Sequence, residues 1–202
     1  MLLKEKVLPI LKEIVLPTVV RQEAEIGGFV FMQALPRHAD LIANLEEQVY
    51  ANDEEQELRI GRTQLAEYLK RDWKYAQVGR PTSFIAYKNE RPVGFMFLQN
   101  YPGTNVMQIG DFATVPQSEG EHIPFSTSIL TLQMIKYVLS QGLEQNISFT
   151  MNARDKTTFN LLQKPTVQKF LAQQGYAVSE TKPVETEYNE GFHYVRISPL
   201  VG

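Results

Sequence analysis

Cysteine is missing from all 202 residues of the chain. Its absence excludes a disulfide scaffold, a zinc site built on thiolates and a cysteine nucleophile. Histidine is scarce as well, and the spacing of His38, His122 and His193 is not typical of metal ligands. We therefore expect no metal site, and the lack of cysteine suits the reducing interior of the cytoplasm, so a cytoplasmic protein is expected.

Long apolar runs and dense positive charge are also lacking. In the first 17 residues the apolar side chains are interrupted by Lys12, Glu13 and two prolines, whereas a signal peptide or a membrane span needs an uninterrupted apolar stretch. The formal net charge is -3, and no run of lysine and arginine offers the basic surface that nucleic acids need. We expect neither a membrane partner nor a nucleic-acid partner.

The residues that are present favour one packed domain. Hydrophobic residues make up 43% and charged residues 21% of the chain, as in ordinary globular proteins. Near the N-terminus, five apolar residues fall on one face of a helix: Leu3, Val7, Ile10, Leu11 and Ile14. We expect a helical extension over 1–26 and the domain over 27–202. The extension is expected to pack on its own domain, and a homodimer contact is the alternative.

Local periodicity predicts the order β-α-α-β-β-β-α-β-α-β. The expected strands cover residues 29–35, 83–87, 93–98, 106–115, 147–151 and 192–197. The expected helices cover residues 37–50, 63–75, 126–141 and 166–174, and Gly142 and Gly175 are expected to end the last two. Asn89 and Pro92 favour a tight turn, so the strands on either side of it should form a hairpin. The pattern predicts an α/β fold with helices on both faces of a mixed sheet.

Several segments in this order resemble the GNAT superfamily of N-acetyltransferases, over roughly residues 29 to 197. The resemblance is carried by Phe84–Tyr87 with Pro92–Phe95 for the family's second and third strands, Asp111–Pro116 for the fourth, Asn152 after the fifth, and Phe170–Tyr176 for the last helix and its Gly-aromatic pair. It implies a mixed, mostly antiparallel central sheet with helices on both faces.

The resemblance also implies a cofactor and a reaction. An acyl-CoA, usually acetyl-CoA, would enter where the family's fourth and fifth strands splay apart, and its acyl group would pass to a primary amine of a small molecule or a protein. Its pantetheine arm would pair with backbone groups of the fourth strand, here Ala113, Thr114 and Val115. Asn152 matches a family asparagine that contacts the pantetheine arm or the phosphate region.

The family's diphosphate loop has an Arg or Gln, two residues, a Gly, one residue and a Gly or Ala, before a helix whose first N–H groups and dipole attract anions. Gln117 and Gly120 match this pattern, but His122 stands at its last position. A second register, with Glu119 first, matches less well. In a third register the hydroxyl side chains of Ser126, Thr127 and Ser128 form the helix start. We favour the third because the helical periodicity begins there.

Acylation of an amine needs a base for the ammonium proton. Asp111 is the candidate, because it lies in an apolar strand where burial would raise its pKa; a structural aspartate at a strand edge is the alternative. His122, which has a near-neutral intrinsic pKa, is a second candidate base or a phosphate contact, unless it is simply an exposed loop residue. Many family members protonate the leaving thiolate with a tyrosine of the last helix, and Leu171 occupies that position here.

These departures leave two further readings open. One is a GNAT-fold binding or regulatory module without efficient catalysis. The other is an acyltransferase whose acyl donor is bound to a carrier protein, for which binding of the CoA nucleotide would matter less.

Overall fold

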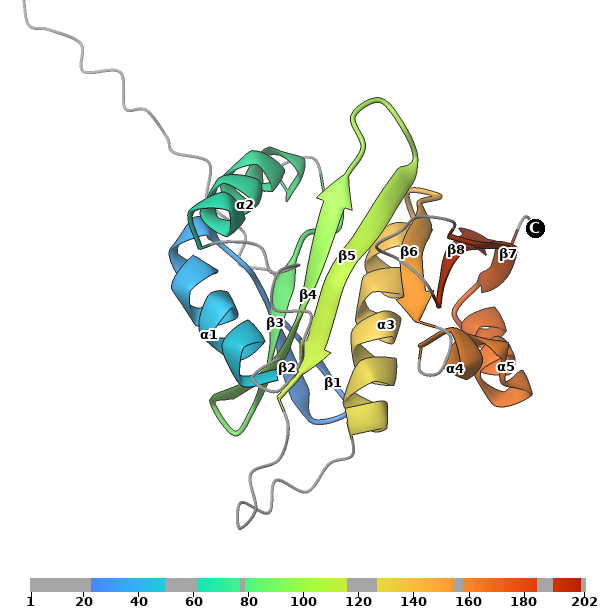
Figure 1. Ribbon diagram of the computed structural model, residues 1–202, viewed down its shortest axis with the longest axis horizontal. Coiled ribbons are helices and arrows are strands. Elements are labelled where there is room, and N and C mark those ends of the chain that lie inside the picture. The colour runs from blue at the N-terminus through green and yellow to red at the C-terminus, as the bar shows by residue number, and fades with distance from the viewer. Residues whose placement is uncertain are drawn as a thin grey trace, which may run out of the picture.

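The computed structural model describes residues 23–49, 62–76, 79–115, 127–154, 158–184 and 191–200. Their centre is one eight-stranded sheet in the order β1-β2-β3-β4-β5-β6-β8-β7 (Figure 1). The strands are β1 (Glu23–Ile26), β2 (Phe29–Gln33), β3 (Phe84–Lys88), β4 (Arg91–Asn100), β5 (Val106–Thr114), β6 (Ser148–Arg154), β7 (Tyr176–Pro183) and β8 (Phe192–Pro199). Neighbouring strands are antiparallel except β5 and β6, which are parallel. The predicted mixed, mostly antiparallel sheet is therefore confirmed.

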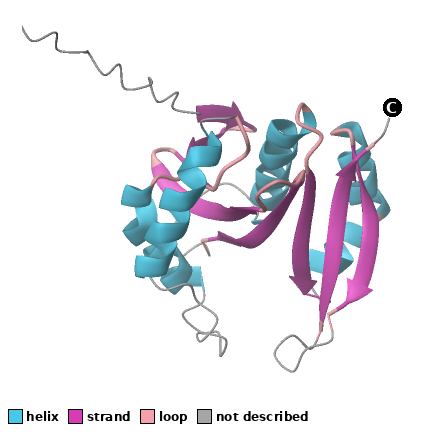
Figure 2. Cartoon of the chain, turned by 90° about the horizontal axis from the view of Figure 1, so that it is seen from above, coloured by secondary structure: helices cyan, strands magenta, loops and turns pink. Residues whose placement is uncertain are grey.

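Helices cover both faces of the sheet, as predicted (Figure 2). They are a 3-10 turn (Pro36–His38), α1 (Ala39–Val49), α2 (Arg62–Ala76), α3 (Thr127–Leu143), α4 (Asn160–Gln163) and α5 (Pro165–Gln173). Helices α1 and α2 pack over β3 to β5 on one face, and α3 packs on the other. None of the helices in the described part of the chain is long and apolar enough to cross a membrane.

Strand β4 is buried on both faces, which explains its unbroken apolar run. Met96 and Leu98 belong to the cluster under α3, whereas Phe95 and Phe97 belong to the cluster under α1 and α2. Successive side chains of a strand point to opposite faces, so a strand between two layers of helices needs apolar residues at every position. The central strands could be predicted for this reason.

The predicted hairpin is confirmed, with a shorter turn than expected. Its two turn residues, Asn89 and Glu90, have φ values of 49° and 65°. Positive φ at both positions is the geometry that matches the twist of paired strands. Strand β4 therefore already begins at Arg91 rather than at 93.

The two glycines that were expected to end helices behave differently. Gly175 follows α5 with a φ of 79°, as a helix stop should. Gly142 lies inside α3, so that prediction was wrong. A Cβ atom at Gly142 would lie 2.6 Å from the ring of Phe149 and 3.0 Å from the hydroxyl of Tyr176. Gly142 is therefore required for close packing of α3 on β6 and β7.

The sequence patterns missed β1, α4 and β7. A helical extension was expected over 1–26, but Glu23–Ile26 is a strand that pairs with β2, so the sheet begins before the predicted boundary at 27. Residues 1–22 of that extension lie outside the described residues. Strand β7 lies at the edge of the sheet, and its residues from Ser179 to Pro183 are exposed. Such an edge strand lacks the apolar alternation on which the prediction depended.

Candidate functional site

The two parallel strands of the sheet stay paired over only a short length. Three residue pairs join them: Val106 with Ser148, Met107 with Phe149 and Gln108 with Thr150. Beyond these pairs, β5 continues to Thr114 beside β4 and β6 continues to Arg154 beside β8. Figure 2 shows the two halves of the sheet diverging from this point. The separation of neighbouring strands that the resemblance implied is therefore present.

An extra residue in β5 accompanies the separation. Phe97 is opposite Asp111 and Leu98 is opposite Ile109, so Gly110 is bulged out of the ladder with β4. A Cβ atom at Gly110 would lie 3.1 Å from the ring of Phe97, which leaves little space for a larger residue. A bulge bends its strand and increases its twist. Gly110 lies two residues beyond Gln108, the last residue of β5 that pairs with β6, and a bend there turns the strand away from β6.

The far end of β5 presents backbone groups on the side that β6 has left. The N–H of Val115 donates to the carbonyl oxygen of Val93 at 2.9 Å, toward β4. Backbone groups alternate along a strand, so those of Ala113 also face β4, whereas those of Phe112 and Thr114 face the opposite side. We call the backbone groups of Phe112 and Thr114 the open edge of β5. It can pair with an extended molecule that carries amide groups.

The first turn of α3 lies over the same end of β5 (Figure 1). A Cβ atom at Gly94 would lie 3.4 Å from Cδ2 of Leu130 and 2.7 Å from the carbonyl oxygen of Ala113, so the helix packs closely on β4 and β5 here. The N–H groups of a first helical turn have no partner within the helix and carry partial positive charge. The open edge and a potential anion site therefore lie at one end of the sheet.

Most of the predicted site residues lie around this end. Ala113 is buried under α1 and α2, while Thr114 and Val115 are half-buried at the end of β5. The backbone of Asp111 is opposite Phe97, next to the bulge, and its side chain is not described.

The loop residues predicted for the diphosphate are only partly described. The backbone of Thr127 and Ser128 forms the start of α3, where the third register puts it. The remaining members of the predicted set lie outside the described residues: Gly120, His122 and Ser126.

Asn152 lies within β6 instead of after it. The strand runs on to Arg154, and Asn152 is an exposed residue opposite Tyr194 of β8. The N–H of Ser148 donates to the carbonyl oxygen of Asn105 at 2.8 Å, toward β5. Every second residue of a strand directs its backbone groups to the same side, so those of Asn152 also face the side of β5. The prediction ended the strand too early because its last residues are polar.

No tyrosine of the last helix or of its end is placed to protonate a leaving group. Leu171 is fully buried in the core. The hydroxyl of Tyr176 donates to the carbonyl oxygen of Ile147 at 3.1 Å, and burial raises the pKa of Tyr176 to about 12. Burial also raises the pKa of Tyr137 to about 12, within an aromatic cluster. The hydroxyl of Tyr176 is therefore structural, and Tyr137 is buried away from the open edge of β5 among aromatic rings.

Two of the three histidines also have structural surroundings. The ring of His193 stacks on Phe159, with centroids 4.0 Å apart and an interplanar angle of 8°. Nδ1 of His38 accepts a hydrogen bond from the N–H of Leu35 at 3.1 Å in the 3-10 turn. Among the described residues, no three histidine, aspartate or glutamate side chains gather as metal ligands would.

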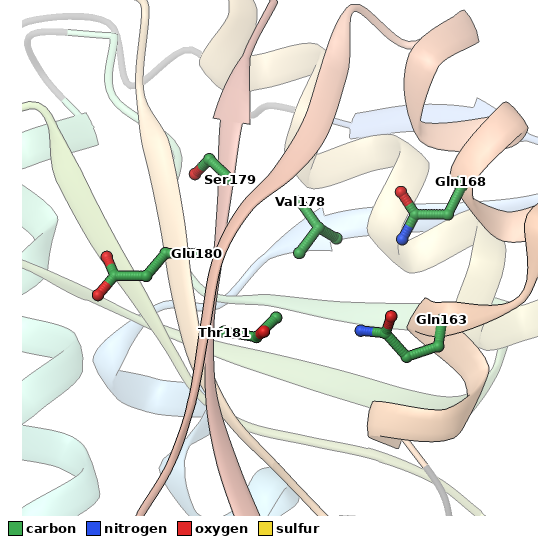
Figure 3. A pocket seen from close by; sticks show the side chains of 6 residues that line it. All are labelled: Gln163, Gln168, Val178, Ser179, Glu180 and Thr181. Atoms are coloured by element: carbon green, nitrogen blue, oxygen red, sulfur yellow. The ribbon is translucent and has the colours of Figure 1, made fainter.

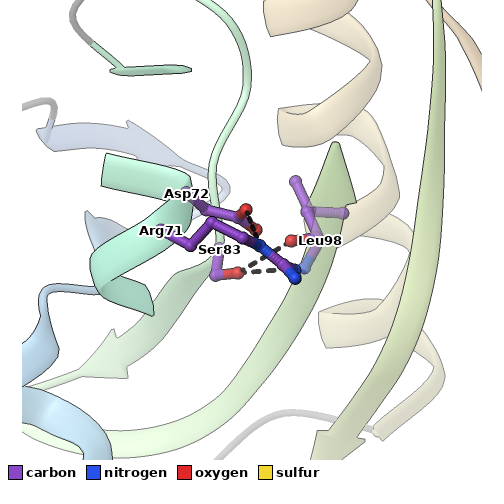
Figure 4. A network of polar contacts seen from close by, with 4 residues as sticks. All are labelled: Arg71, Asp72, Ser83 and Leu98. Carbon is purple, nitrogen blue, oxygen red and sulfur yellow. Dashed lines mark hydrogen bonds and ion pairs between the residues drawn. The ribbon is translucent and has the colours of Figure 1, made fainter. Parts of the chain in front are cut away.

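A buried carboxyl group lies between α2 and the sheet (Figure 4). Asp72 is 2% exposed, and its Oδ1 lies 3.4 Å from Nε of Arg71. Burial raises the pKa of Asp72, and the neighbouring Arg71 lowers it by a smaller amount. Beside it, Oγ of Ser83 accepts a hydrogen bond from the N–H of Leu98 at 3.0 Å.

A pocket of about 310 Å³ lies between β7 and the helices α4 and α5 (Figure 3). It is lined by Gln163, Gln168, Val178, Ser179, Glu180 and Thr181. Strand β8 separates β7 from β6, so this pocket lies at the outer edge of the sheet, away from the point where β5 and β6 part.

Strand β8 contributes two polar side chains that the sequence analysis did not select. Val195 and Ile197 point into the core, so the alternate residues Tyr194 and Arg196 lie on the other face. That face of β6, β8 and β7 is not covered by any described helix (Figure 2). The alternation of residues 192–197 was visible in the sequence and indicates the face on which both residues lie, but it does not single either of them out.

Solved structures with a similar fold include acetyltransferases and proteins solved with an acyl-CoA. The ribosomal-protein-S5-alanine acetyltransferase of Vibrio fischeri has a TM-score of 0.58 at 10% identity, over 88% of this chain and 96% of that chain. The yncA protein of Salmonella typhimurium, solved with acetyl-CoA, has a TM-score of 0.54 at 9% identity, over 86% and 95%. GphF, a GNAT-like decarboxylase solved with isobutyryl-CoA, has a TM-score of 0.52 at 14% identity, over 85% and 99%.

No protein-family model matches the chain, and the comparison with curated proteins gives no match. At such low identities the structural similarity concerns the fold, and one fold supports several reactions.

Proposed function

We propose that this chain, whose fold is that of the GNAT acetyltransferases, is an acyl-CoA-dependent N-acyltransferase that acts on a primary amine. The observation that supports the proposal most is the three-pair ladder between β5 and β6, followed by their separation. In this arrangement the pantetheine arm pairs with the open edge of β5, and Asn152 lies on the facing strand. The diphosphate lies at the first turn of α3, near Ser126, Thr127 and Ser128.

The reaction is a direct attack. The amine nitrogen bonds to the thioester carbon, a backbone N–H of β5 polarises the carbonyl, and the carbon–sulfur bond then breaks. Asp111 takes the proton that the amine loses, and the thiolate leaves as free CoA after protonation by water. Water is the proposed proton donor, because Leu171 has no acidic group and the buried hydroxyl of Tyr176 is bonded to the carbonyl oxygen of Ile147.

Thermal unfolding with acetyl-CoA, longer acyl-CoAs and free CoA tests the proposal. Binding to the folded state should add about 2.7 kcal/mol of stability at a ligand concentration 100 times Kd. The unfolding midpoint should therefore keep rising with the logarithm of the ligand concentration. Calorimetry gives the same Kd independently. If none of these ligands changes the midpoint or releases heat, the chain does not use acyl-CoA.

A binding module is the second candidate, because the last helix has the buried Leu171 at the position where many family members have a tyrosine that protonates the thiolate. A module would bind CoA yet leave acyl-CoA intact with every amine offered. Release of free CoA, measured with a thiol reagent across a panel of amines, separates the two functions. The reagent reports only on the product, because the chain itself has no thiol.

A further inference from the structure

A row of four residues crosses the strands at the level where β5 and β6 part. Gln108 is opposite Thr150, Thr150 is opposite Arg196, and Arg196 is opposite Glu180 of β7. Arg196 lies on the face of β6, β8 and β7 that no described helix covers (Figure 2). We call this surface the uncovered face. A substrate that approaches the separation from this side meets Arg196.

The guanidinium of Arg196 has no hydrogen-bond or ion-pair partner among the described residues. Arg196 is half-buried, and its Nε is shielded from solvent without an acceptor. The carboxylate of its cross-strand neighbour Glu180 lies instead 3.4 Å from Nζ of Lys182. Lys182 also lies 4.6 Å from the centre of the Tyr194 ring. A shielded guanidinium donor without an acceptor is costly, which suits a group that an anionic ligand completes.

The backbone that carries Arg196 is well held. Oγ of Ser179 donates to the carbonyl oxygen of Arg196 at 3.3 Å and lies 2.8 Å from Oγ of Ser198. On the β6 side of Arg196, Thr150 is buried, and its Oγ1 donates a hydrogen bond to the carbonyl oxygen of Met107 at 3.4 Å. Arg196 therefore projects from strands fixed on both sides, which lowers the entropy lost when it binds a ligand.

We propose that Arg196 binds a carboxylate of the acceptor, so that the preferred substrates are peptide-like amines carrying an acidic group. This inference rests on the proposed acyltransfer function. Arg196 is two strand spacings from β5, roughly 10 Å, so the carboxylate would be several bonds away from the attacked amine. A guanidinium binds a carboxylate through two parallel N–H donors.

The charge and the position both favour an acceptor carboxylate over a phosphate of CoA. Arg196 is the one cation of its row, and Lys182 is already paired with Glu180. Among these described side chains Arg196 therefore offers a single unpaired positive charge, which suits a monoanion. The first turn of α3 lies at the opposite end of β5. From Gln108 to Thr114 the strand advances six residues, about 20 Å at the usual rise.

Two dipeptide amides, Ala-Glu and Ala-Gln, test the proposal with the full chain. They have the same amine and nearly the same shape, and differ in one carboxylate. Calorimetry in the presence of CoA and turnover with acetyl-CoA should both favour Ala-Glu, by roughly 10- to 100-fold in Kd or KM, the usual range for a hydrogen-bonded charge. This comparison uses the unmodified protein, so it does not depend on a variant that folds.

Arg196→Gln should abolish the preference for Ala-Glu and leave the Kd of acetyl-CoA unchanged. Arg196→Lys keeps the charge but not the paired donors, and should retain part of the preference. Lys169→Gln removes a positive charge from α5, on the opposite face, and should retain all of it.

Three results would overturn the inference: equal binding of the two dipeptides by the unmodified protein, binding of neither, or a loss of acetyl-CoA affinity in Arg196→Gln. Failure of the proposed function looks different. In that case acetyl-CoA does not bind, while Ala-Glu still binds in an Arg196-dependent way.

Discussion

At the scale of single residues, Asp111 is the proposed base, and its backbone lies beside the bulge of β5. Asp111 is opposite Phe97 in the ladder, next to Gly110. Asp111→Asn should lower kcat by roughly 10²- to 10⁴-fold, since general base catalysis contributes that much, and should leave the Kd of acetyl-CoA unchanged. Turnover assays at a series of pH values measure the change in kcat. Asp40→Asn, an exposed change on α1, is the control. Unchanged turnover of Asp111→Asn at every pH would remove this residue from the mechanism.

A second aspartate affects stability. Burial raises the pKa of Asp72 above its ordinary value of 3.8, so the folded state holds this proton more tightly than the unfolded state does. The contribution of Asp72 to stability is therefore greatest below pH 3.8 and falls as the pH rises through its folded pKa. Asp72→Asn removes the buried charge. It should be more stable than the unmodified protein at pH 7, and this advantage should vanish near pH 3.5.

Urea denaturation at the two pH values measures the effect of Asp72→Asn. The ion pair that is lost contributes little, because the side chain of Arg71 is 48% exposed. A variant that is less stable than the unmodified protein at pH 7 would mean that the carboxylate stabilises the fold.

At the scale of elements, β5 has one paired side and one open side beyond Gly110. Thr114→Pro removes an N–H that does not pair with β4, so it should change stability little and weaken acetyl-CoA binding by roughly 2- to 10-fold, as expected for one hydrogen bond. Ala113→Pro removes an N–H that faces β4 and should destabilise the protein strongly. Calorimetry and urea denaturation of both variants measure these effects. Equal acetyl-CoA affinity in Thr114→Pro and the unmodified protein would mean that the open edge is not used.

Elements with strong local patterns were predictable, and those defined by distant partners were not. The two-sided burial of β4 gives an apolar run, and Asn89 and Pro92 indicated the hairpin that precedes it. Strand β7 is stabilised by its pairing with β8, and its own exposed residues show no apolar alternation. Gly142 looked like a helix stop because a sequence cannot show that the ring of Phe149 occupies the space of its Cβ.

The candidate site was predictable only in part for the same reason. The resemblance indicated the strands that separate, and the structure has that separation after Gln108 and Thr150. Arg196 could not be selected from the sequence, because its importance depends on where Glu180 and Lys182 point. Alternation in β8 gives the face on which a residue lies, but not whether its charge is paired.

At the scale of the whole molecule, the sheet consists of two parts joined by three residue pairs. One part, β1 to β5, has helices on both faces, whereas β6, β8 and β7 have one face that no described helix covers (Figure 2). In the proposed arrangement the acyl donor and the amine acceptor would thus meet where the part of the sheet covered on both faces adjoins the part covered on one face. The proposed order of groups is diphosphate at α3, pantetheine along β5, and acceptor on the uncovered face.

Amide hydrogen exchange of β5, followed by NMR with and without acetyl-CoA, tests the central claim most directly. The amides of Ala113 and Val115 face β4 and should be protected in both states, which provides an internal control. The amides of Phe112 and Thr114 should exchange readily without ligand and become protected when acetyl-CoA binds. If acetyl-CoA binds while Phe112 and Thr114 exchange as fast as before, the cofactor does not pair with the open edge and the account is contradicted.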